Sequence, residues 1–98
     1  MKSISVDIPP SLRILNPPEV RSIAIRMIHG TFKREDLSEI VATRYRTKHS
    51  ANTIARNVTS DDLAQLEQAL INSKDAIDFQ RAYILSVNEY MLYVLIRQ

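Results

Sequence analysis

The sequence contains no cysteine and only one glycine among its 98 residues. Without cysteine the chain has no disulfide, no thiolate nucleophile and no cysteine-ligated metal site, and such a composition is typical of a reducing cytoplasm. Loops that cradle phosphates need several glycines where the backbone turns tightly against a ligand, so the single Gly30 excludes P-loop and dinucleotide-binding folds. The length suits one domain with one hydrophobic core.

Long hydrophobic runs are missing as well. The first ten residues alternate between apolar and polar types, whereas a signal peptide needs an unbroken apolar core. The most apolar stretch, residues 83–96, is shorter than the roughly 20 residues of a membrane span and is interrupted by Ser86, Asn88 and Glu89. We therefore predict a cytoplasmic protein that makes no membrane contact.

Proline is confined to the first 18 residues of the chain. The remaining 80 residues carry no proline, which favours helices because proline removes a backbone donor and breaks helical hydrogen bonding. We predict a single domain over residues 1–98, with an extended arm over residues 1–16 and a helical body over residues 17–98. The predicted fold class is mainly α, a small bundle of four or five helices with an extended N-terminal arm or short strand.

The arm has the pattern of a half-buried strand, because Ile4, Val6 and Ile8 alternate with polar residues. A lone strand needs a partner, and the sequence leaves three arrangements open. The arm pairs with a second copy of the chain, pairs with a strand near the C-terminus, or lies unpaired as a strap across the helices. We favour the strap.

The first helix is predicted over about residues 17–29. Asn16 is a favourable N-cap, Pro17 and Pro18 fit the first turn, and Gly30 suits the left-handed residue that ends a helix. An apolar stripe at helical spacing indicates the buried side. It consists of Val20, Ile23, Ala24, Met27 and Ile28.

A second helix is predicted over about residues 32–45, with Thr31 as its cap. Glu35 and Asp36 fall in its first turn and Arg44 in its last, as the helix dipole favours. The residues predicted to be buried are Leu37, Ile40, Val41 and Tyr45.

Two further helices follow a polar turn. Ser50 or Asn52 is predicted to cap a short third helix that carries Ile54, Ala55 and Val58. Thr59 and Asp62 resemble a capping box that opens a fourth helix, extending to about residue 71. Its apolar residues at helical spacing are Leu63, Leu66 and Leu70.

Residues 75–97 are predicted to form a fifth helix that is apolar on nearly every side. Such a helix must be covered all round, and a chain of this size has little material left to cover it, so we predict a homodimer through this helix. The predicted dimer interface consists of Phe79, Tyr83, Tyr90, Met91, Tyr93 and Val94. The alternative is that residues 90–96 form a strand that pairs with the N-terminal arm, since aromatic and β-branched residues favour strands.

Charge is divided along the chain. Residues 26–58 carry seven Lys or Arg against three acids, whereas residues 59–98 carry three Lys or Arg against six acids. A positive middle and a negative, apolar end are expected when the middle approaches phosphates and the end associates with protein. A solvated surface without a partner is the other explanation for such clusters.

Residues 37–58 resemble a helix-turn-helix, with Ser50 as the cap of the second helix and Ile54 and Val58 as its anchors. The connection over residues 45–49 is about three residues longer than the usual turn and lacks the customary glycine. No glycine-containing hairpin follows Val58, so we expect no wing. The resemblance implies nucleic-acid contacts from Arg44, Arg46, Lys48, His49, Ser50, Asn52, Thr53, Arg56 and Asn57.

Catalytic chemistry finds little support. His29 and His49 lie 20 residues apart without metal-binding spacing, and the adjacent acids Glu35 and Asp36 point apart on a helix. We predict no enzyme activity, no catalytic residue, no metal site and no cofactor. The predicted function is a small DNA-binding regulator of transcription, dimeric through its C-terminal helix. The alternative is a helical protein-interaction module, such as a secretion chaperone, phage-encoded inhibitor or adaptor, that holds a protein partner through the same apolar helix.

Overall fold

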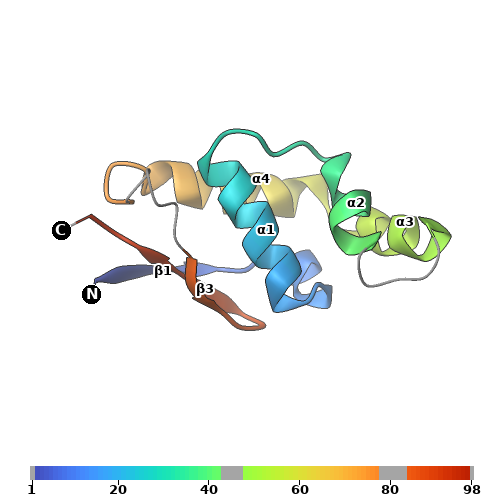
Figure 1. The fold of residues 1–98 in the computed structure, drawn as a ribbon, viewed down its shortest axis with the longest axis horizontal. Helices are drawn as coiled ribbons and strands as arrows, with labels where there is room; N and C mark the ends of the chain where they lie inside the picture. Colours follow the sequence, from blue (N-terminus) through green and yellow to red (C-terminus); the bar gives the residue numbers. More distant parts are fainter. Residues whose placement is uncertain (1, 43–47, 78–83, 98) are drawn as a thin grey trace.

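The structure is a computed structural model that describes residues 2–42, 48–77 and 84–97. These residues form four α-helices, one short 3₁₀ helix and a three-stranded sheet, so the fold is a small mixture of α and β elements. Figure 1 shows their arrangement. In chain order the elements are β1 (Ser3–Asp7), a 3₁₀ helix (Pro10–Ile14), α1 (Pro17–Ile28), α2 (Asp36–Ala42), α3 (Lys48–Asn57), α4 (Ser60–Asn72), β2 (Ile84–Val87) and β3 (Met91–Leu95).

Helix α1 confirms its prediction from local signals. The Glu19 carboxylate accepts a hydrogen bond from the Asn16 backbone N–H at 2.7 Å, and Gly30 has a φ of 72° where the helix ends. Every residue of the predicted apolar stripe, from Val20 to Ile28, is buried. The fourth helix is confirmed too, since the Thr59 hydroxyl accepts a hydrogen bond from the Asp62 N–H at 3.1 Å at the start of α4.

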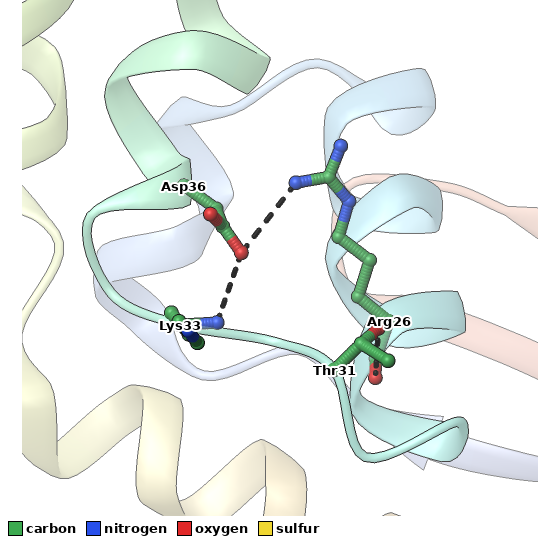
Figure 2. A network of polar contacts seen from close by, with 4 residues as sticks. All are labelled: Arg26, Thr31, Lys33 and Asp36. Atoms are coloured by element: carbon green, nitrogen blue, oxygen red, sulfur yellow. Dashed lines mark hydrogen bonds and ion pairs between the residues drawn. The ribbon is translucent and has the colours of Figure 1, made fainter.

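The second helix begins later than predicted. Helix α2 begins at Asp36 and not at Phe32, because Asp36 closes a turn with Lys33: its N–H donates to the Lys33 carbonyl, and its carboxylate accepts from the Lys33 N–H at 3.0 Å. The same carboxylate lies 3.6 Å from the Arg26 guanidinium of α1 (Figure 2). Asp36 therefore fixes both the start of α2 and its position beside α1. The predicted burial of Leu37, Ile40 and Val41 is correct, and Tyr45 lies outside the described residues.

The third helix starts earlier than predicted, at Lys48. Ser50 and Asn52 therefore lie inside α3 and are not its cap. The fifth predicted helix is wrong: β2 and β3 form an antiparallel hairpin within residues 84–95. The apolar residues that suggested a helix buried on all sides lie in strands. The central strand β3 buries Leu92 and Val94 in the core and pairs with a strand along each edge.

The N-terminal arm is a strand and not a strap. Strand β1 pairs antiparallel with β3, and the sheet order is β1-β3-β2. The register places Ile4 opposite Val94 and Val6 opposite Leu92, so the apolar side of both strands faces the helices. The alternative prediction, a C-terminal strand that pairs with the arm, is thus confirmed.

Helices α1 and α4 pack against each other, and α1 also contacts β2 while α4 contacts β1. One core runs through these elements and continues into α2 and α3. The molecule measures 44 × 22 × 22 Å, and Figure 1 shows α3 at one end of the long axis and the chain termini at the other. No helix within the described ranges is long and apolar enough to cross a membrane.

Candidate nucleic-acid interface

The predicted nucleic-acid contacts lie in α3 and in the connection before it. Arg44 and Arg46 fall outside the described residues, and Lys48 and His49 form part of the first turn of α3. The other predicted contacts are all on α3 itself: Ser50, Asn52, Thr53, Arg56 and Asn57.

Helix α3 is anchored by small side chains. Ala51, Ala55 and Val58 are buried at i, i+4 and i+7 spacing, with Ile54 partly buried beside them. The predicted anchors were Ile54 and Val58. Ala55 was predicted as an apolar residue of this helix, whereas Ala51 was missed. Alanine lets two helices approach closely, which fits the packing of α3 chiefly on α2.

The other side of α3 faces solvent. Thr53, Arg56 and Asn57 are exposed, whereas Ser50 and Asn52 are half-buried at the border of that side. Seven of the predicted contacts thus lie on one helix, and three of them, Thr53, Arg56 and Asn57, are exposed. Threonine and asparagine carry donors and acceptors suited to base edges, and arginine suits both phosphate and guanine.

The C-terminal end of α3 is held by an arginine that the sequence prediction did not assign to the site. The Arg34 guanidinium donates to the Val58 carbonyl at 2.7 Å and to the Ala55 carbonyl at 3.4 Å, and it lies 3.4 Å from the Ser60 hydroxyl. The Ala55 carbonyl also accepts from the Val58 N–H at 3.2 Å, so the main role of Arg34 is to supply a donor to the Val58 carbonyl and a positive charge that opposes the negative end of the helix dipole. Arg34 therefore positions α3.

A shallow groove separates the start of α2 from α3. Its lining residues are Arg34, Glu35, Leu37, Ser38, Asn52, Ala55 and Arg56. The Arg56 Nε atom lies 3.4 Å from the Asn52 carbonyl, so the Arg56 side chain runs back along α3 toward its N-terminus. Glu35 is the acid of this groove and partly offsets the two arginines. The chain between Ile40 and Ser60, in contrast, carries four Lys or Arg and no acid.

The connection between α1 and α2 is held in a defined course by polar contacts. Figure 2 shows Asp36 between Arg26 and Lys33, and the Thr31 hydroxyl against the Arg26 carbonyl at 3.3 Å. Thr31 therefore closes the end of α1 and is not the cap of α2, which was its predicted role. Because α3 packs chiefly on α2, these contacts also orient α3 relative to the rest of the core.

The predicted dimer interface does not form the face of one helix. Val94 is fully buried in the core of its own chain, so it is not available to a partner. Met91 and Tyr93 are partly exposed on the outer side of β3. Tyr90 is 59% exposed at the turn of the hairpin, where the Arg13 guanidinium lies 5.1 Å from its ring centre. Phe79 and Tyr83 lie outside the described residues.

The hairpin turn contains no glycine, so the sequence lacks the residue that usually indicates such a turn. The Asn88 side-chain oxygen accepts hydrogen bonds from the Tyr90 and Met91 N–H groups, each at 2.8 Å. The Asn88 N–H in turn donates to the Met91 carbonyl at 2.9 Å. The hairpin is part of the sheet, and its strand β2 contacts α1. It does not lie beside α3, as a wing would.

Acidic and histidine side chains do not gather at a metal site within residues 2–42, 48–77 and 84–97, where no group of three such ligands occurs. Searches with protein-family models, curated proteins and solved structures found nothing that matches this chain.

Proposed function

We propose that this protein binds duplex DNA through the exposed side of α3 and regulates transcription. The observation that carries the proposal is the division of α3 into two sides. Buried alanines fix one side to α2, and Thr53, Arg56 and Asn57 occupy the other. A recognition helix needs this division, because its anchors must be buried while its polar side chains reach phosphates and base edges.

Two further features support the proposal. Helix α3 lies at the end of the molecule's long axis, where a duplex can approach it without meeting the sheet (Figure 1). The sequence from residue 40 to residue 60 contains Arg44, Arg46, Lys48 and Arg56 without a single acid, so its charge favours a phosphate backbone. The reducing cytoplasm remains the predicted setting for this activity.

The proposal is tested by fluorescence anisotropy with a labelled duplex of random sequence, titrated at several salt concentrations. We expect log affinity to fall linearly as log salt rises, because each phosphate contact releases counterions. Arg56→Ala should reduce the slope by about 1, and the double change Arg46→Ala with Lys48→Ala by about 2, since each cation contributes roughly one contact.

Lys2→Ala is the matched control, because Lys2 is exposed and lies beside the sheet, away from α3. It removes the same unit of charge as Arg56→Ala and should leave the slope unchanged. Equal losses from both variants would show attraction to net charge alone. Absence of binding at low salt would overturn the proposal and favour the alternative class, a protein-interaction module.

Asn57→Ala separates base reading from phosphate contact. If Asn57 reads a base edge, its loss should leave affinity for random duplex unchanged and reduce discrimination among sequences selected from a random pool by about 1–3 kcal/mol at one position. Unaltered sequence selection by the variant would remove Asn57 from the reading residues.

A further inference from the structure

The two edges of the sheet differ in how open they are to another strand. Strand β2 has an irregular register between Ile84 and Ser86, and its Ile84 carbonyl accepts a hydrogen bond from the Arg21 guanidinium at 3.0 Å. Irregular register and an occupied carbonyl both obstruct the addition of a strand. Strand β1 has neither feature, since its pairing with β3 is regular from Ser3 to Asp7.

The outward backbone groups of β1 can be identified from the pairing. The Ile8 N–H donates to the Tyr90 carbonyl at 2.9 Å, and the Ile96 N–H donates to the Lys2 carbonyl at 3.1 Å. Hydrogen-bonded pairs alternate along an antiparallel ladder, so Lys2, Ile4, Val6 and Ile8 direct their backbone groups toward β3. The odd-numbered residues direct theirs to the free edge.

Those odd-numbered residues are Ser3, Ser5 and Asp7, and all three are exposed. Within the described part of the chain, no hydrogen bond is recorded to their outward N–H and carbonyl groups. Their side chains are small, and the one charge among them, Asp7, lies at the end of the strand, while lysine and proline are absent from Ser3–Asp7. Strand β1 is therefore a template for one more antiparallel strand.

We propose that a second copy of this chain occupies this edge, with the two β1 strands antiparallel about a two-fold axis at Ser5. In this register Ser5 faces its equivalent, and Ser3 of each chain faces Asp7 of the other. A serine hydroxyl can donate to the facing carboxylate, and no like charges meet. Ile4, which is only partly buried within one chain, gains the partner's Val6 as a neighbour.

The flanking residues agree with this register and limit the assembly to two chains. Pro9 lies beyond the paired segment Ser3–Asp7, so the prolines do not interrupt the new ladder. Because β2 is obstructed, each chain offers one open edge, and the two-fold pairing closes without further growth. Helix α3 lies far from β1 along the long axis, which leaves its exposed side free in both copies (Figure 1).

The first test is the mass of the protein by sedimentation equilibrium at rising concentration. A five-residue strand pairing buries less than the roughly 1,600 Å² of a standard stable interface. We therefore expect a reversible monomer–dimer equilibrium with a Kd of about 1 μM or weaker. A chain that stays monomeric up to ~1 mM would overturn the proposal.

Ser5→Pro is the sharpest variant. Proline removes only the outward N–H of residue 5, which takes no part in pairing with β3, and it suits extended backbone at an edge. We expect a folded monomer, with an unchanged circular dichroism spectrum. A variant that dimerises as the wild type does would show that the interface lies elsewhere.

A pair of lysine variants tests the register without proline. Ser5→Lys places like charges opposite each other across the axis and should raise the Kd up to about fivefold, whereas Ser3→Lys faces Asp7 of the partner and should leave it unchanged or lower it. Both variants add the same charge to the same strand. Equal Kd values for the two variants would overturn this register.

Amide exchange measured by NMR gives an independent reading. The N–H groups of Ser3, Ser5 and Asp7 should gain protection as concentration rises, while those of Ile4 and Val6 should be protected at every concentration, because they bond to β3 within one chain. Protection of the odd-numbered amides that does not change with concentration would contradict the proposal.

Discussion

Helices α3 and α4 are separated only by Val58 and Thr59, yet they are held in different ways. Helix α4 buries three leucines and packs on α1, with further contacts to β1 and the 3₁₀ helix. Helix α3 buries two alanines and packs chiefly on α2. Large apolar side chains fix α4 to several neighbours, whereas small ones hold α3 close to a single neighbour, and both helices leave their other side to solvent. The two helices therefore differ in the size of their buried side chains and in how many elements they contact, and not in having an exposed side.

The largest effect is expected from shortening one apolar side chain in each helix, which tests whether α4 is more deeply embedded than α3. Leu66 is fully buried in α4, so Leu66→Ala should lower the free energy of unfolding by about 3 kcal/mol. Ile54 is only partly buried in α3, and Ile54→Ala should cost about 1 kcal/mol, because less apolar surface returns to water. Urea unfolding measures both. Equal costs would mean that α3 is as deeply embedded as α4.

A smaller effect is expected from the cation that holds the end of α3. Arg34→Ala removes the donors to the Val58 and Ala55 carbonyls and should lower stability by about 1 kcal/mol, because the hydrogen bonds lie near solvent. The loss should be local, with faster amide exchange in α3 and unchanged exchange in α4. Lys33→Ala is the control, since it removes a neighbouring exposed cation and leaves the Lys33 N–H bonded to Asp36. Unchanged exchange in α3 would remove Arg34 from its positioning role.

The smallest effect concerns the polar attachment at the start of α4. The pKa of Asp62 lies below its usual range. The hydrogen bond from the Ser11 hydroxyl lowers it most, followed by that from the Ser11 backbone N–H, and the Thr59 hydroxyl and Arg13 lower it further. Partial burial raises the pKa and so opposes these effects. The Ser11 N–H donates to the Asp62 carboxylate at 2.8 Å, which ties the 3₁₀ helix to α4.

Because the pKa of Asp62 is lower in the folded chain, the carboxylate adds stability above the unfolded pKa, and that stability is lost as pH falls through the folded value. Asp62→Asn should therefore be slightly less stable than the wild type near neutral pH, and the difference should shrink as the pH falls below about 4. Urea midpoints at several pH values measure it. A difference that stays constant would show that the ionised carboxylate contributes nothing.

The helices α1 and α4 could be predicted from the sequence because their signals are local. Asn16, Gly30 and Thr59 mark helix ends through contacts within a few residues, and the apolar stripes between them repeat at helical spacing. The strand pattern of the arm was equally clear. Its partner was not, because β1 pairs with a strand at the far end of the chain.

The C-terminal hairpin and part of the candidate site were missed for other reasons. Asn88 forms the hairpin turn where glycine is the usual signal, and β3 lacks a clear apolar–polar alternation, because Met91 and Tyr93 on its partly exposed side are apolar as well. Arg34 reaches Val58 across 24 residues, a contact that no local pattern reveals. For α3, Thr53, Arg56 and Asn57 are exposed while Ser50 and Asn52 are half-buried, and Ala51 was missed because a single alanine carries a weak apolar signal.

The pairing of β1 with β3 also affects how the protein is made. Strand β3 lies in the middle of the sheet and is the last of the described elements to be synthesised. On the ribosome, β1 must therefore wait with Ile4 and Val6 uncovered while the helices form from local contacts, and the sheet can close only when β3 has left the exit tunnel. During that interval β1 is unpaired along both edges, so nascent chains are most exposed to misassembly before β3 emerges from the tunnel.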